Sequence, residues 1–350
     1  MFGFGTGKSV VGLDIGSSAV KAVELRGVGK KFKLGAMAIE PIPADSIVDG
    51  AIIDRGAVAE AIRKVFAGQT FKTRDVAASL SGNSVIVKKI SLPVMTEAEL
   101  AQSIHWEAEQ YIPFDIQDVN LDYQILDPGT GPESRGAMEV LLVAAKKEKI
   151  ADYTEVITQA GCKPVVVDVD AFALQNACEL NYGLDPTEVT VLVNAGASAV
   201  NINIVSNNQS LFTRDISLGG NAYTEAVQRE LGLSFESAEL AKKGLLFDGP
   251  SMDDVRPILH AMTENVLLEI HKTFDFFRAT ATSDRIDRIL LSGGASSVDG
   301  FAQALEARFE APVERFDPFK NIACDHTMSP ELVSKAAVAV GLALRKGGEK

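Results

Sequence analysis

The feature that most constrains this fold is a short motif that occurs twice, as LDIGSSAV at residues 13–20 and as VNAGASAV at residues 193–200. Glycine, serine, alanine and valine coincide at four positions, and Asp14 of the first copy corresponds to Asn194 of the second. In both copies the small residues lie between two apolar runs, which is typical of a β-hairpin turn. The repeat therefore predicts two similar α/β halves, with a nucleotide clamped between two hairpin turns.

A second glycine-rich segment, GFGTGKS at residues 3–9, resembles a P-loop. A P-loop needs four residues between its first glycine and the Gly-Lys-Ser/Thr, and it leads from a strand into a helix. Only three residues separate Gly3 from Gly7, and the apolar residues after Ser9 predict a strand. Without a helix N-terminus there is no positive dipole end to meet a phosphate. We expect this segment to be a lead-in to the first strand.

The first repeat copy carries the residue types that phosphate binding needs. Asp14 stands at a predicted strand end, where a carboxylate can hold Mg²⁺ through water. Gly16 allows a ligand to approach the backbone closely. Ser17 and Ser18 offer backbone N–H groups and hydroxyls to a phosphate. Lys21 adds a positive charge, although a lysine on a strand can instead face solvent, and Asp-x-Gly-Ser also occurs in plain turns.

The second copy offers Gly196, Ala197 and Ser198 to the other phosphates. Asn194 is neutral where the first copy has an acid, which weakens the local field for Mg²⁺ and predicts slow turnover.

Two later segments extend the candidate site. Gly293, Gly294 and Ala295 follow an apolar run, and a flat base or ribose can lie against such a turn. Glu239 and Lys242 share one helix face, where they can hold a ribose and a base. For the glycine turn the alternative is a plain, tight strand-to-helix turn, and for Glu239 and Lys242 the alternative is a solvated ion pair.

The sequence also predicts one last helix, over residues 330–345.

Composition excludes several classes of function. The formal net charge of −13 argues against nonspecific binding to nucleic acid or to anionic lipid. The three cysteines form no CxxC pair and the four histidines lack ligand spacing, so neither disulfides nor zinc are predicted. No apolar run approaches the ~18 residues of a membrane span. We expect a cytoplasmic protein.

These motifs together resemble the actin-like ATPase superfamily. Within it, three stretches resemble the PilM family of type IV pilus assembly proteins: VGLDIGSS at residues 11–18, HWEAEQYIPF at 105–114 and FTRDISLGGN at 212–221. The resemblance implies an actin-like α/β fold whose two halves flank a nucleotide cleft, with an FtsA-type inserted subdomain. It implies a first subdomain of residues 1–74 and 164–187 and an inserted subdomain of residues 75–163. The second half is implied to divide into residues 188–224 with 285–350, and residues 225–284.

The resemblance also implies ATP and Mg²⁺ in the cleft and, at most, a slow ATPase. By motif it assigns the first phosphate role to Asp14, Gly16, Ser17, Ser18 and Lys21, with Mg²⁺ held by Asp14 through water. It assigns the second phosphate role to Gly196, Ala197 and Ser198. It assigns binding of the ribose and base to Glu239 and Lys242, and the adenosine turn to Gly293, Gly294 and Ala295. Relatives place an acid near the attacking water at the position of Asp170.

The implied partner is the N-terminal cytoplasmic tail of the inner-membrane protein PilN, bound in a groove between the first and inserted subdomains. Other pilus machine proteins and self-association are further expectations, and the membrane would be reached only through the partner. Two alternatives remain open: an FtsA-like, filament-forming cell-division protein, and a small-molecule kinase with Asp168 or Asp170 as general base.

Overall fold

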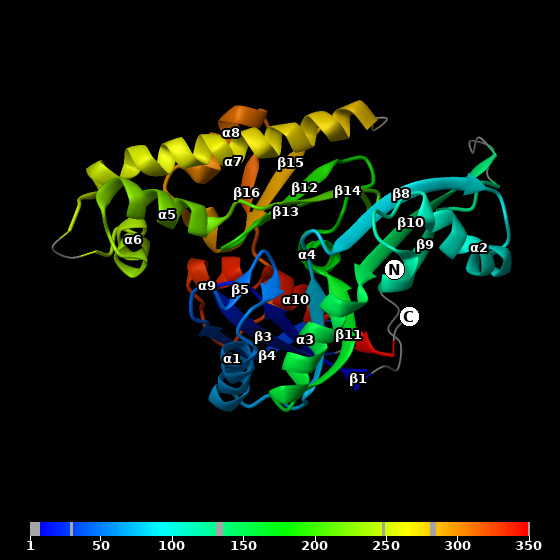
Figure 1. The fold of residues 1–350 in the computed structure, drawn as a ribbon, viewed down its shortest axis with the longest axis horizontal. Helices are drawn as coiled ribbons and strands as arrows, with labels where there is room; N and C mark the ends of the chain where they lie inside the picture. The colour runs from blue at the N-terminus through cyan, green and yellow to red at the C-terminus, as the bar shows by residue number, and fades with distance from the viewer. Residues whose placement is uncertain (1–7, 29–30, 131–135, 247–248, 281–284, 349–350) are drawn as a thin grey trace.

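The computed structural model describes residues 8–28, 31–130, 136–246, 249–280 and 285–348 (Figure 1). The predicted lead-in at residues 3–9 lies mostly outside them. Two large β-sheets dominate the structure. In spatial order the first contains β11 (Lys163–Val169), β7 (Asp75–Leu80), β2 (Val11–Ile15), β3 (Ala19–Val28), β4 (Lys31–Pro41) and β17 (Ile322–Ala323). The second contains β16 (Val313–Arg315), β15 (Arg288–Ser292), β12 (Thr190–Ala195), β13 (Val200–Ser206) and β14 (Gln209–Ile216).

The two sheets share one strand topology. Each contains an antiparallel hairpin, β2–β3 in the first sheet and β12–β13 in the second. A third strand continues each hairpin antiparallel, and a later strand pairs in parallel with the first strand of the hairpin. The two halves that the repeated motif predicts are therefore confirmed, and the chain has the mixed α/β architecture expected.

Helices separate and cover the sheets. Between them lie α4 (Asp170–Tyr182) and α10 (Ala337–Ala343), whose apolar side chains form one cluster with residues of both sheets. The outer face of the first sheet is covered by α1 (Arg55–Gly68) and α3 (Lys147–Gln159), next to the short ladder of β5 (Ile47–Val48) and β6 (Ala51–Ile52). The outer face of the second sheet is covered by α7 (Met252–Thr280) and α8 (Phe301–Phe309), with α5 (Gly220–Leu231) and α6 (Phe235–Lys242) at one end (Figure 1).

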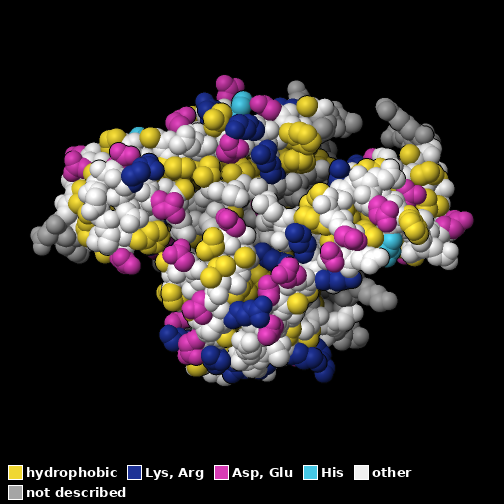
Figure 2. Space-filling view, viewed as in Figure 1, with side chains coloured by type: hydrophobic (Ala, Val, Ile, Leu, Met, Phe, Trp, Pro, Cys, Tyr) yellow, Lys and Arg dark blue, Asp and Glu magenta, His cyan; other side chains and the backbone are white. Residues whose placement is uncertain are grey.

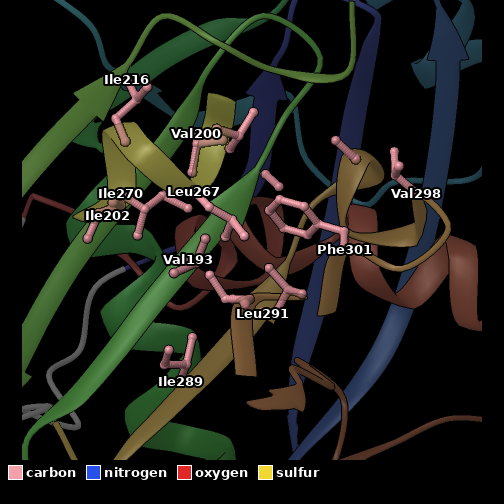
Figure 3. Close-up of a cluster of buried hydrophobic side chains, with 14 of the residues drawn as sticks. Val193, Val200, Ile202, Ile216, Leu267, Ile270, Ile289, Leu291, Val298 and Phe301 are labelled. Carbon is pink, nitrogen blue, oxygen red and sulfur yellow. The ribbon is translucent and has the colours of Figure 1, made fainter. Parts of the chain in front are cut away.

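The core of the second half lies between its sheet and α7 and α8 (Figure 3). Ile202 and Ile204 of β13 belong to this core, while the intervening Asn203 points to the other face. That face is also buried, because α4 covers it, and Asn203 Nδ2 donates a hydrogen bond to the Ala171 carbonyl there (2.9 Å). Apolar residues on one face and a satisfied amide on the other explain how the strand is buried on both sides.

The inserted subdomain contains the sheet β8 (Val85–Pro93), β10 (Ala137–Lys146) and β9 (Val119–Asp127), with α2 (Glu97–Glu109) and the 3₁₀ turn η1 (Ile116–Asp118) packed on it. Thr96 and Glu99 form a capping box at the N-terminus of α2. Ala108 and Ile112 of the HWEAEQYIPF stretch are buried in this subdomain's own core. Trp106 of the same stretch is 73% exposed.

The last residues of the chain lie with the first sheet, which corrects their predicted place in a second-half subdomain of residues 285–350. β17 pairs with β4, β18 (Lys346–Gly347) pairs with β1 (Lys8–Ser9), and α10 packs on β2. The single helix predicted over residues 330–345 is two helices, α9 (Pro330–Lys335) and α10, with Ala336 between them. The chain end returns to the first sheet because every residue of α10 is buried, so this helix must pack against a partner on each side.

Candidate functional site

The two repeated hairpin turns meet each other directly. Ser17 Oγ donates a hydrogen bond to Ser198 Oγ across 2.8 Å, although the two residues are 181 positions apart. Each turn is closed in the same way: the N–H of Gly16 donates to the Ala19 carbonyl (3.1 Å), and the N–H of Gly196 donates to the Ala199 carbonyl (2.8 Å). The structure thus brings the two predicted phosphate turns together, with hydroxyl and backbone donors on both sides of the junction.

An ion pair lies at the base of the first turn. Lys21 Nζ is 2.9 Å from Asp14 Oδ2, and both side chains are only 14% exposed. Lys21 therefore does not face solvent. A Cβ atom on Gly16 would lie 2.9 Å from Lys21 Nζ, so a residue with no side chain leaves room for the ammonium group beside the turn. The Asp14 carboxylate is therefore paired with the Lys21 ammonium group in this structure.

The second turn has an amide pair at the equivalent place. Asn194 Nδ2 donates to Asn201 Oδ1 (3.1 Å), and Ser292 Oγ donates to Asn194 Oδ1 (3.4 Å). Asn201 Nδ2 in turn donates to Asp215 Oδ1 of β14 (2.7 Å). The sequence reasoning missed Asn201 and Asp215. The repeat contains a signal for the first of them, because the spacing that relates Asp14 to Asn194 also relates Lys21 to Asn201.

The N-terminus of α5 is fastened to the second turn. Gly220 N–H donates to the Gly196 carbonyl (2.9 Å), and Asn221 N–H donates to the Ala197 carbonyl (2.7 Å). A Cβ atom on Gly219 would lie 2.6 Å from the Ala197 carbonyl oxygen, so the two segments are in close backbone contact. These bonds satisfy donors that the first turn of a helix leaves free.

The predicted Glu239–Lys242 pair lies beside this junction. Lys242 Nζ is 2.5 Å from Glu239 Oε2 and donates to the Gly220 carbonyl (3.0 Å). Burial opposes ionisation of Glu239, but Lys242, Thr224 and Lys243 outweigh it and hold the pKa of Glu239 below its ordinary value. Burial lowers the pKa of Lys242 against the attraction of Glu239. The pair is thus partly buried and bound to α5, and is not the freely solvated alternative.

The predicted glycine turn after β15 packs against the second hairpin. Gly293 has a φ of +88°, and a Cβ atom on it would lie 2.2 Å from the Ala195 carbonyl oxygen. Its own carbonyl accepts hydrogen bonds from the Ser296 and Ser334 hydroxyls at 2.6 and 2.7 Å. The turn continues into the 3₁₀ helix η2 (Gly294–Ser297), where Ala295 lies close to Gly220. The tight turn therefore requires a glycine at position 293, independently of any ligand that the segment binds.

Asp170, the first residue of α4, accepts a hydrogen bond from Ser79 Oγ (2.5 Å). The surrounding protein removes its carboxylate from water, and the negative charge of Asp14 acts in the same direction. Together they raise the pKa of Asp170 to about 6, against the hydrogen bonds of Ser79 and Ser81. A carboxylate that titrates near neutral pH is suited to accept and release a proton. The described residues contain no group of three or more His, Cys, Asp or Glu arranged to hold a metal ion.

Comparison with known proteins places this geometry in context. The family model described as type IV pilus assembly protein PilM matches residues 12–347. The solved structure of a PilM-PilN type IV pilus biogenesis complex is similar with a TM-score of 0.85 and 29% identity, covering 98% of this chain and 99% of that chain.

More distant similarities extend to other actin-like proteins. MreB5 of Spiroplasma citri bound to ADP has a TM-score of 0.54 at 14% identity, covering 95% of this chain and 94% of that one, which shows likeness of fold. The cell division protein FtsA of Bacillus subtilis (strain 168) is 23% identical over 275 residues, 70% of this chain. The match spans 60% of the length of FtsA.

Proposed function

Because this chain belongs to the type IV pilus assembly protein PilM family, we propose that it is an actin-like adaptor of the pilus machine that binds ATP between its halves and the N-terminal cytoplasmic tail of PilN. The observation that carries the proposal is the contact between Ser17 and Ser198, which joins the two turns at one point. Similarity to a solved PilM-PilN complex supports the choice of partner. Recruitment to the membrane would then go through PilN, and among the described residues no helix is long and apolar enough to cross a bilayer.

In this proposal the phosphates of ATP lie between the two turns. Asp14 holds Mg²⁺ through water, and Lys21, 2.9 Å from that carboxylate, supplies positive charge to the phosphates. Lys242 and Glu239, fastened to α5, hold the ribose and base, with Gly293, Gly294 and Ala295 on the other side. Asp170 is the candidate to orient a water molecule. Mg²⁺ would supply charge neutralisation of the phosphates.

Slow turnover is part of the proposal. In the second hairpin the amide pair of Asn194 and Asn201 replaces the ion pair of the first, so of the two hairpins only the first offers a carboxylate at this position. The output of the nucleotide would then be a change in partner affinity, which is a shift between conformations of the protein.

Asp14→Ala tests the nucleotide part. We expect the variant to lose the Mg²⁺-dependent share of ATP affinity, because the water-mediated carboxylate is removed. Titration of a fluorescent ATP analogue with and without Mg²⁺ measures this share. Asp253→Ala is the matched control, since its side chain is 90% exposed. Equal Mg²⁺ dependence in wild type and Asp14→Ala would contradict the assigned role.

The partner surface that we propose is a hollow of about 330 Å³ where the inserted subdomain joins the first half. It is lined by Phe114, Asp115, Asp118, Lys146, Lys147 and Glu148. Lys146 Nζ lies over the Phe114 ring, 4.3 Å from its centre, so an aromatic ring and charges of both signs lie together in this hollow. Such a mixture suits a peptide that presents both apolar and polar side chains.

A further inference from the structure

A chain of hydrogen bonds leads from the second hairpin turn out of the second half. It begins at Ser292 and Asn194, passes through Asn201 and reaches Asp215 Oδ1 at 2.7 Å. Asn201 is 6% exposed and pairs directly with Asp215 in the β13–β14 register. The first hairpin closes the equivalent interaction within itself, as the Asp14–Lys21 ion pair. The amide pair of the second half is therefore joined by a further hydrogen bond to Asp215, whereas the Asp14–Lys21 ion pair lies within one hairpin.

The other carboxylate oxygen of Asp215 leaves its own half of the molecule. Asp215 Oδ2 accepts the backbone N–H of Gly82 at 2.5 Å. Gly82, with a φ of +81°, belongs to the short connection from β7 of the first sheet to β8 of the inserted subdomain. This connection is also bound to the chain's return path, since Lys146 N–H donates to the Ser84 carbonyl (3.0 Å). One side chain thus fastens β14 to the hinge of the inserted subdomain.

The inserted subdomain lies against the second half along the same strand. β8 and β14 are neighbours in Figure 1. At the far end of β14, Gln209 Nε2 donates a longer hydrogen bond of 3.5 Å to the Leu126 carbonyl of β9. The inserted subdomain is therefore covalently part of the first half, where Val85 and Ala145 pack with the core, and it also contacts the second half along β14.

The charges around the hinge form one group. Besides burial and Asp14, Asp215 contributes to the raised pKa of Asp170. Burial lowers the pKa of Lys149, while Asp170, Asp152 and Asp215 oppose that effect. Lys149 Nζ donates to the Gly50 carbonyl (2.5 Å) on the first half. A phosphate placed between the turns would add negative charge to this group.

We propose that Asp215 is a positioning residue that couples the second hairpin turn to the hinge at Gly82, so that nucleotide at the turns changes the affinity of the inserted subdomain for its partner. The inference rests on the proposed function and names the side chain through which its two sites communicate. Coupling of this kind is a ratio of affinities, typically about fivefold or more. It needs a discrete physical link that both sites bias, which the hydrogen bonds of Asn201 and Asp215 provide.

The test measures the Kd of a synthetic PilN tail for the full chain with and without a non-hydrolysable ATP analogue and Mg²⁺. We expect a ratio of about fivefold or more in the wild type and a ratio near one in Asp215→Ala. Asp127→Ala is the matched control. Asp127 also accepts a glycine N–H, that of Gly129 at 2.8 Å, but this bond lies within the inserted subdomain and should leave the ratio unchanged.

Two further variants separate positioning from stability. Asp215→Asn keeps an acceptor for Gly82, and its amide can donate to Asn201 once Asn201 and Asn194 are both turned over, with the Ser292 hydroxyl then accepting from Asn194, so the ratio should be largely restored. Asn201→Ala leaves the Gly82 bond in place but cuts the chain one residue earlier, and its ratio should fall to near one. Hydrogen exchange at the Gly82 amide should be faster in Asp215→Ala than in the wild type. Asn201→Ala carries the test if Asp215→Ala does not fold.

The outcomes distinguish the inference from the function on which it rests. A wild type that binds neither the peptide nor the nucleotide contradicts the proposed function and the inference together. Binding of both ligands with a ratio of one in the wild type contradicts the inference alone. A wild-type ratio retained in Asp215→Ala or in Asn201→Ala overturns it as well.

Discussion

At the scale of single residues, the two hairpins keep the same turn and differ in the chemistry beneath it. Asp14 and Lys21 form an ion pair in one copy, and Asn194 and Asn201 form an amide pair in the other. The ion pair offers charges that a metal and a phosphate can use. The amide pair offers directional hydrogen bonds, which lead on to Asp215. We infer that the first copy binds the ligand, and that the second copy both binds the ligand and couples it to the inserted subdomain through Asp215.

Asp170→Asn gives a residue-scale prediction. The pKa of Asp170 is raised from 3.8 to about 6, so the folded protein binds this proton more tightly than the unfolded chain. The group therefore favours folding at low pH, and this contribution is lost as the pH rises from about 4 to about 6. Asparagine keeps an acceptor for Ser79 without the charge. At pH 7.5 the variant should be more stable, on the order of 3 kcal/mol.

Urea denaturation at pH 7.5 and at about pH 4 measures the difference, which should be much smaller at the lower pH, because the carboxyl is then protonated in the folded protein and about half protonated in the unfolded chain. Asp325→Asn is the control, because this carboxylate is 66% exposed and should show little difference at either pH. A gain in Asp170→Asn that is equal at both pH values would show that burial and Asp14 do not raise its pKa.

At the scale of elements, α10 shows both what the sequence predicts and where it stops. The sequence predicts a helix over residues 330–345, but periodicity indicates buried faces and not the partner that covers each face. The structure places one side of α10 on β2 and the other on α4. The capping box at Thr96 and the hairpin turns were predictable because their signals lie within a few residues.

The candidate site was likewise predictable from the sequence only in part. The turns, Asp14, the Glu239–Lys242 pair and the glycine turn at Gly293 were predictable from short motifs. The link through Asp215 to Gly82 was not, because it joins residues 133 positions apart, and nothing in the FTRDISLGGN stretch that contains Asp215 indicates Gly82 as its partner. The return of the chain end to the first sheet was missed for the same reason: strand pairing with β4 depends on the assembled fold.

Gly341→Ala is the element-scale prediction for stability. A Cβ atom there would lie 1.7 Å from the Ala173 carbonyl oxygen, so α10 and α4 would have to separate. We expect the free energy of unfolding to fall by about 3 kcal/mol or more. Gly68→Ala in α1 meets nothing within 4 Å and should leave stability unchanged or raise it by up to about 1 kcal/mol. Equal stability of the two variants in urea denaturation would show that the helices are not in backbone contact.

The aromatic residues of the HWEAEQYIPF stretch give an element-scale prediction for binding. Phe114 lines the hollow beside α3, whereas Trp106 projects from the outer side of α2 and is 73% exposed. Phe114→Ala should weaken binding of the PilN tail by about tenfold, which corresponds to ~1.4 kcal/mol. Trp106→Ala should leave it unchanged, and thermal unfolding checks that both variants fold. The reverse order of effects would move the partner surface to α2.

At the scale of the whole molecule, the inserted subdomain contacts both halves, since Val85 and Ala145 pack with the core of the first half and β8 lies beside β14 of the second. The halves touch at Ser17 and Ser198, and the subdomain is held by Asp215. Lysine, arginine and acidic side chains are interspersed over the face shown in Figure 2. A partner therefore has local features of shape and charge to recognise, and the hollow at Phe114 is the one we assign to a peptide.

The central claim is that this chain is an adaptor for PilN, and calorimetric titration of the full chain with the synthetic PilN tail tests it most directly. We predict saturable one-to-one binding, with a Kd that changes when an ATP analogue and Mg²⁺ are present. Absence of binding at peptide concentrations up to about 1 mM, with and without nucleotide, would contradict the account.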